Sequence, residues 1–233
     1  MNRETQGIVT GLVGGAVLYA ALTDTYLRYV KAGLRPLLIL TAVLLLATAA
    51  VTLWQEYRSH RKENDGHDHG GSRLSWLLVA PVLAVVVAAP PALGSYTADR
   101  AGTALQRPTG FADLPAGDPL PMRVMDYAAR AAFDGGRSLE GRRIELTGFL
   151  SYGRAGTPYL TRMTLNCCAA DAQPIKVGLA GTVPAGLKAD TWLRVTGTYT
   201  AHVAKDDING GPIPSIEVVE VHRVGAPPQQ YEN

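Results

Sequence analysis

The stretch "RRIELTGFLSY", residues 142–152, decides the fold of the C-terminal half of this chain. Apolar and polar side chains alternate along it, which is typical of a β-strand with one buried face. Gly148 lies near its middle, where a strand of a small barrel has to bend. We therefore expect this segment to be the first strand of a small, strongly curved sheet.

Four further runs with the same alternation follow, and turn-forming residues separate them. They cover residues 158–168, 174–180, 191–202 and 214–224. A second central glycine, Gly197, lies within the fourth of the five strands. Five short strands in about eighty residues predict a small all-β, OB-like five-stranded barrel, and a small open β-sandwich is the alternative.

The N-terminal part of the chain is apolar enough to enter a membrane. Residues 36–54 carry no charge over 19 positions, close to the length that a helix needs to cross about 30 Å of hydrocarbon. Residues 74–93 form a second uncharged run. Residues 7–23 form a shorter, glycine-rich run, for which a secretory signal peptide is the alternative. We predict a membrane-anchored protein of two parts, in which three transmembrane α-helices precede the β domain.

These patterns give a domain organisation in four parts. Gly/Pro-rich composition indicates the linker, and a helical period that stops at two glycines indicates a helix before the barrel. The parts are a transmembrane region at 1–95, a linker at 96–121, a helix plus OB-like β domain at 122–225, and a tail at 226–233.

Glycines form a small-residue patch on the first predicted helix, at Gly11, Gly14 and Gly15. Such patches let another helix approach closely. That helix belongs either to this chain or to another membrane protein. We take Gly11 and Gly15 as candidate partner-binding positions.

The distribution of positive charge favours one orientation in the membrane. The cluster "RSHRK" at 58–62 is the densest group of basic residues near a predicted span, which favours a cytoplasmic position for this loop and for the N-terminus. We therefore predict a multi-pass protein of the cell membrane with its C-terminal β domain outside the cytoplasm. The net charge of +2 is too small to favour nucleic acid, so the expected partners are the lipid bilayer and other membrane proteins.

The only two cysteines of the chain are adjacent, in "TLNCCAADAQPIKV". If the second strand continues through both, alternation buries Cys167 and places Cys168 on the outer face. Two thiols on opposite faces cannot bind one ion together, whereas a strand that ends earlier lets them cooperate. A vicinal disulfide, a reactive Cys168 thiol, and a metal site of Cys167, Cys168 and Asp171 all remain open.

A second group of metal-ligating side chains lies in the loop between the second and third predicted helices. His60, His67 and His69 fall within ten residues there. Imidazole suits zinc, copper and nickel, so this loop is a candidate for weak metal capture. A polar loop is also what any two membrane helices need between them, and the histidines can equally be solvated loop residues.

Sequence motifs of the common enzyme classes are absent. There is no nucleophile elbow, phosphate-binding glycine loop or zincin helix. A Cys-His-Asp set can be drawn from Cys168, His202 and Asp171, but any chain with two cysteines and five histidines allows such a choice. We therefore expect no catalytic residues and a protein that is not an enzyme.

The layout of the chain and one motif resemble a known family. "TYLRYVKAGLRPLLIL" leads into the second predicted helix, and "APPALGSY" ends the third. The β domain carries the pattern Arg-x-x-x-x-Cys-Cys-x-Ala-Asp-Ala from Arg162 to Ala172. These features resemble the YcgQ-like family of bacterial membrane proteins over nearly the whole chain. The resemblance implies pairing with a YcgR-like multi-span permease and a link to divalent metal homeostasis.

Two functions are compatible with these observations. The first is an accessory subunit of a membrane transport system that presents its β domain for docking or sensing. The alternative is a metal-binding or thiol-redox membrane protein that acts through Cys167 and Cys168, with a divalent metal such as zinc as the candidate cofactor. Arg162 and Asn166, on the outer face of the second strand, are candidate partner-binding residues.

Overall fold

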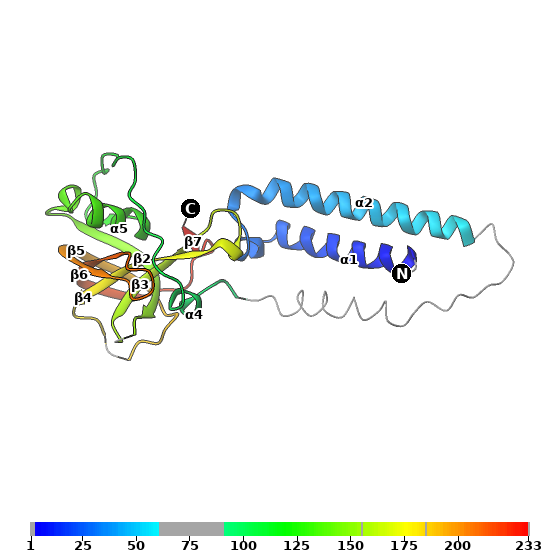
Figure 1. The fold of residues 1–233 in the computed structure, drawn as a ribbon. Coiled ribbons are helices and arrows are strands. Elements are labelled where there is room, and N and C mark those ends of the chain that lie inside the picture. Colours follow the sequence, from blue (N-terminus) through cyan, green and yellow to red (C-terminus); the bar gives the residue numbers. More distant parts are fainter. Residues whose placement is uncertain (1–2, 61–90, 155, 185, 233) are drawn as a thin grey trace. The chain divides into compact units, whose positions relative to one another are not determined.

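The computed structural model describes residues 3–60, 91–154, 156–184 and 186–232 (Figure 1). The chain divides into two compact units, Met1–Pro91 and Ala92–Asn233. The third predicted helix, residues 74–93, falls almost entirely outside the described residues.

The first unit contains two apolar helices. They are α1 (Arg3–Leu22) and α2 (Arg35–His60), connected through the short 3-10 helices η1 (Asp24–Arg28) and η2 (Ala32–Leu34). The segments Thr5–Leu22 and Ala32–Arg58 are long and apolar enough to cross a membrane, and most of their surface is exposed. Two of the three expected apolar helices are therefore present.

Small residues form the contact between α1 and α2. A Cβ atom on Gly11 would lie 3.6 Å from the Cβ of Ala49, and one on Gly14 would lie 3.0 Å from the Cβ of Leu45. Gly15 has no described atom within 4 Å of its Cβ position. Gly11 therefore serves packing within the helix pair, while a partner contact at Gly15 stays a prediction.

The second unit is a closed five-stranded β-barrel, as the alternation in the sequence predicts. The strands pair in the order β2-β5-β6-β4-β3, and β2 pairs with β3 to close the ring (Figure 1). Neighbouring strands are antiparallel except β4 and β6, which are parallel. The strands are β2 (Arg143–Tyr152), β3 (Pro158–Thr164), β4 (Gln173–Gly181), β5 (Trp192–Lys205) and β6 (Pro212–Arg223).

The bend in β2 closes the barrel. Residues 143–149 of β2 pair with β5, and residues 149–152 pair with β3. At the change of partner, a Cβ atom on Gly148 would lie 2.7 Å from the carbonyl oxygen of Thr161, which is too close for any side chain. The glycine expected at a bend is therefore the residue that lets β3 pass against β2.

One hydrophobic core fills the barrel and continues beneath α5 (Val124–Phe133). The ring of Tyr127 is completely buried there, and its hydroxyl donates a hydrogen bond of 2.7 Å to the carbonyl oxygen of Ser215. Gly135 and Gly136 follow the helix with φ angles of 62° and 72°, a left-handed conformation that favours glycine. The predicted helix and its terminator are both confirmed.

Two segments that the sequence assigns to a linker and a tail contribute short strands. β1 (Leu120–Pro121) pairs in parallel with β2, and β7 (Tyr231–Glu232) pairs in parallel with β3. A short helix, α4 (Ser95–Ala98), also lies within the expected boundary region. Two-residue strands leave no period in a sequence, so alternation could not reveal them.

Replacing Gly148 with Ala should destabilise the barrel by roughly 1–3 kcal/mol, because the added methyl group meets a backbone oxygen that cannot move freely. Urea unfolding of the purified chain in detergent, followed by near-ultraviolet circular dichroism, measures the effect. Gly225→Ala is the matched control, since the Cβ position of Gly225 is open. Equal stability of the two variants would contradict the assigned role of Gly148.

Candidate functional site

The adjacent cysteines lie in the turn between β3 and β4. β3 ends at Thr164, and the turn includes the 3-10 helix η5 (Ala169–Asp171). The carboxylate of Asp171 replaces the strand ladder here: its Oδ1 accepts a hydrogen bond of 3.0 Å from the Asn166 N–H, and its Oδ2 accepts one of 2.8 Å from the Cys167 N–H. We call residues 166–171 the cysteine turn.

The expected burial of Cys167 is wrong. Cys167 is exposed and Cys168 is half-buried. The expectation assumed that extended geometry continues to residue 168, but alternation ceases where the strand ends, at Thr164. The two thiols are therefore free to face a common point.

The cysteine turn brings three metal-ligating groups together. The Sγ atoms of Cys167 and Cys168 and a carboxylate oxygen of Asp171 all lie within 4.8 Å of one another. Two sulfurs on one tetrahedral zinc ion are about 3.8 Å apart, given Zn–S bonds of about 2.3 Å. These atoms thus need a movement of about one ångström or less to share one ion.

Electrostatics couple the thiol of Cys167 to Asp171. The Sγ of Cys167 donates a hydrogen bond of 3.0 Å to Oδ2 of Asp171. This bond, together with one to Cys168, raises the pKa of the Cys167 thiol to about 11. The same bond from Cys167 is the main reason why the pKa of Asp171 lies below its usual value. At neutral pH the turn therefore pairs a protonated thiol with an ionised carboxylate.

The histidines of the second predicted metal site fall outside the side chains that the structure describes. His60 ends α2, and its side chain is not described. His67 and His69 lie outside the described residues. Within the described part of the chain, Cys167, Cys168 and Asp171 are the one group of three potential ligands that comes together.

Arg162 is buried rather than presented on an outer face, with 8% of its surface exposed. Its guanidinium group lies 5.0 Å from the ring centroid of Trp192, and its Nη2 donates a hydrogen bond of 3.1 Å to the carbonyl oxygen of Gln229. Its Nε lies 3.6 Å from Oε1 of Glu232, and burial lowers the pKa of Arg162. Arg162 therefore contacts the C-terminus of its own chain. Asn166 is exposed, so its partner role stays a prediction.

Sequence reasoning missed the C-terminal residues that surround this arginine. Tyr231 and Glu232 are 2% and 6% exposed, although they lie in a Pro/Gln-rich stretch that reads as a tail. Their signal was weak, because a single aromatic residue beside a single carboxylate has no period.

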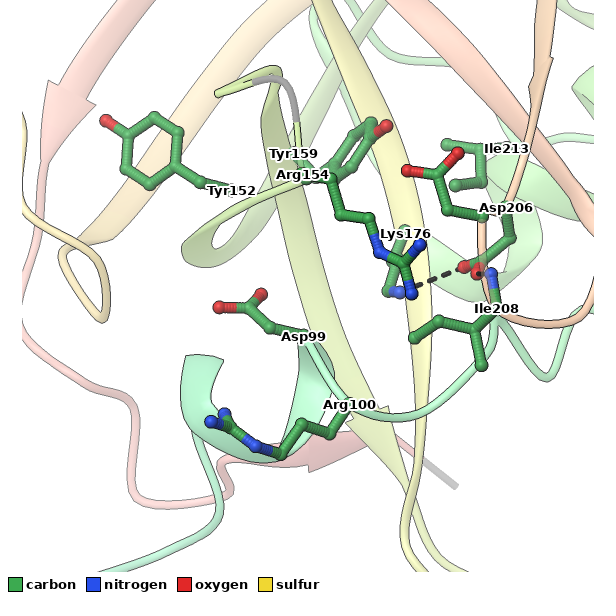
Figure 2. Close-up of a pocket in the computed structure, with 11 residues that line it drawn as sticks. Asp99, Arg100, Tyr152, Arg154, Tyr159, Lys176, Asp206, Ile208 and Ile213 are labelled. Atoms are coloured by element: carbon green, nitrogen blue, oxygen red, sulfur yellow. Dashed lines mark hydrogen bonds and ion pairs between the residues drawn. The ribbon is translucent and has the colours of Figure 1, made fainter.

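A separate pocket of about 360 Å³ lies at another place on the barrel (Figure 2). Nζ of Lys176 lies 2.9 Å from Oδ2 of Asp206, and it also donates to the carbonyl oxygen of Ala101 at 2.9 Å. The carboxylate of Asp206 further accepts hydrogen bonds from the N–H groups of Thr103 and Ile208.

This second pocket is built around a structural ion pair. Burial tends to raise the pKa of Asp206, but the hydrogen bonds from Lys176 and the backbone outweigh burial and hold the pKa below its usual value. Lys176 lies on β4, Asp206 lies in the β5–β6 turn, and both side chains bind backbone groups of the segment after α4. The pair therefore connects these three parts of the barrel unit. The cysteine turn remains the stronger candidate for a functional site.

Comparison with known proteins places the cysteine turn within a recognised domain. Residues 135–232 match a family model described as the DUF1980 C-terminal domain. The match runs from the end of α5 to β7, and it contains all five barrel strands. No curated protein and no solved structure matches this chain.

Replacing Asp171 with Asn should speed alkylation of Cys167 on the order of tenfold at pH 8, because loss of the carboxylate charge lowers the thiol pKa and enlarges the thiolate fraction. The rate is measured with iodoacetamide in a Cys168→Ser background, so that one thiol reacts. Asp207→Asn in the same background is the control. Equal rates for all three proteins would show that Asp171 does not govern this thiol.

Proposed function

We propose that this chain is a membrane-anchored accessory protein that binds a thiophilic divalent cation at the cysteine turn. Zinc is the candidate cation. The observation that carries the proposal is the convergence of two sulfurs and one carboxylate oxygen within 4.8 Å. Thiolate sulfur and carboxylate oxygen are both established zinc ligands. Carboxylate sites without sulfur suit harder cations, so the two sulfurs favour a thiophilic metal.

Each of the three residues has a different part in binding the cation. Asp171 is held in place by the N–H groups of Asn166 and Cys167, so its carboxylate is already oriented. To hold the cation, Cys167 and Cys168 would each release a thiol proton to solvent, and the two thiolates and the carboxylate of Asp171 would be its ligands. Cys168 supplies the second sulfur from the neighbouring position.

Three protein ligands leave one position of a tetrahedral ion open, and Cys167 is exposed. Structural zinc sites have four protein ligands, whereas sites that exchange or activate something keep a position for another group. The open position suits transfer of the cation to or from a partner. This supports the role of an accessory subunit rather than that of a permanently loaded structural domain.

The N-terminal unit supports the membrane setting. α1 and α2 have the length and apolar surface of membrane-spanning helices, which supports a multi-pass protein. We propose that a YcgR-like permease is the partner, that the barrel is of the OB type, and that it lies outside the cytoplasm.

Metal binding is tested with the full chain in detergent. Purified protein should bind one Zn²⁺, and Co²⁺ should give the absorption of a thiolate–cobalt bond. Cys167→Ser and Cys168→Ser should each weaken Zn²⁺ binding by roughly 100-fold or more, because each removes one of the two sulfur ligands. Asp171→Asn should weaken it less, and Asp207→Asn should leave it unchanged. Wild-type binding in both cysteine variants would overturn the proposal.

The orientation is tested by fusions after residue 233. An alkaline phosphatase fusion should be active and a green fluorescent protein fusion dark, because the basic cluster at 58–62 favours a cytoplasmic loop. A fusion placed after residue 60 is the control and should give the opposite pair of results. A fluorescent C-terminal fusion would reverse the proposed orientation.

A further inference from the structure

We propose that the C-terminal strand β7 is a clamp that holds the cysteine turn in its metal-binding shape; this inference rests on the metal-binding function proposed above. β2 pairs with β3 only as far as Thr161, which leaves the last part of that strand edge open. β7 occupies it: Tyr231 pairs with Met163 and Glu232 pairs with Thr164. These are the last two residues of β3 before the turn.

Tyr231 shares one small hydrophobic cluster with both ends of the turn. It belongs to a small hydrophobic cluster that includes Met163 and Leu165, and Ala172 packs against the same cluster. Leu165 comes directly before the cysteine turn, and Ala172 directly after it. Both ends of the turn therefore pack on the cluster that β7 completes with Tyr231.

Glu232 fixes β7 in place. Its Oε1 and Oε2 accept hydrogen bonds of 2.8 and 2.9 Å from the N–H groups of Val124 and Met125, at the N-terminus of α5. A helix N-terminus favours a carboxylate, because its N–H groups carry partial positive charge. The guanidinium group of Arg162 also lies beside Oε1 of Glu232. The two-residue strand is thus held by more than its short ladder with β3.

The clamp also holds the start of the barrel unit. The hydroxyl of Tyr231 accepts a hydrogen bond of 2.9 Å from the Leu93 N–H. Ala92 and Leu93, the first residues of this unit, pack against the same small cluster. Tyr231 therefore connects the cysteine turn to the point where the chain enters the barrel unit, and we expect displacement of one to alter the other.

Two buried tyrosines provide a matched test in the full chain in detergent. Tyr231→Leu should weaken Co²⁺ binding by roughly 10–100-fold, the loss typical of residues that position metal ligands. Tyr127→Leu is the control, because Tyr127 is completely buried but belongs to the main core. It should lower the unfolding temperature at least as much and leave Co²⁺ affinity within about twofold of wild type. If either Leu variant fails to fold, Tyr231→Phe and Tyr127→Phe make the same comparison at the hydroxyl groups.

A second readout separates this inference from the proposed function. In a metal-free Cys168→Ser background, Tyr231→Leu should speed alkylation of Cys167 roughly tenfold, because a loosened turn releases the thiol from Asp171. Faster alkylation in a chain whose wild type does not bind Co²⁺ would reject the metal function and retain the clamp. Normal Co²⁺ binding by wild type, with equal affinities for the Tyr231 and Tyr127 variants, would retain the function and overturn the clamp.

Discussion

Closure of the barrel depends on one strand, β2, that pairs with two of the other barrel strands. Its first residues pair with β5 and its last with β3, and the change is possible because Gly148 allows the backbone of Thr161 to approach. Closure of a small barrel removes most strand edges. It also sets where pairing ends: β2 leaves β3 at Thr161, and the remaining edge is taken by the C-terminal strand. The place where β7 pairs with β3, next to the cysteine turn, therefore follows from the geometry of closure.

The cysteine turn itself shows competition between a strand ladder and a local side chain. Asp171 satisfies the N–H groups of Asn166 and Cys167, which a longer hairpin would otherwise satisfy from β4. The same carboxylate accepts a hydrogen bond from the thiol of Cys167. One residue thus satisfies the backbone just after the strand ends, and its carboxylate lies within 4.8 Å of both sulfurs, where it is the third ligand of the proposed site. Because the cysteines lie in a turn, their sulfurs can approach one point, whereas adjacent residues of a strand point to opposite faces.

Alternation in the sequence was sufficient to predict the five strands, and helical spacing was sufficient to predict the helix before them, because each of these elements buries one face. The adjacency of the two cysteines, with a carboxylate close behind, named Cys167, Cys168 and Asp171 as one candidate group, although strict alternation would have separated the two sulfurs. Alternation failed after the end of β3, where the Cys167 N–H donates a hydrogen bond to the carboxylate of Asp171, four positions later, and the strand period no longer applies. It failed again at Tyr231 and Glu232, whose burial depends on an edge that exists only after closure. Of the glycine patch, Gly11 faces Ala49 of α2, and a sequence cannot show whether a patch of small residues faces a helix of its own chain or of a partner.

The central claim is that the two sulfurs and the carboxylate of one turn bind one cation. Zinc K-edge X-ray absorption of the zinc-loaded full chain tests it most directly, because the method counts the atoms bound to the metal. The account predicts two sulfur neighbours at about 2.3 Å, with the remaining neighbours oxygen or nitrogen at about 2.0–2.2 Å. A first shell of oxygen and nitrogen alone would contradict it.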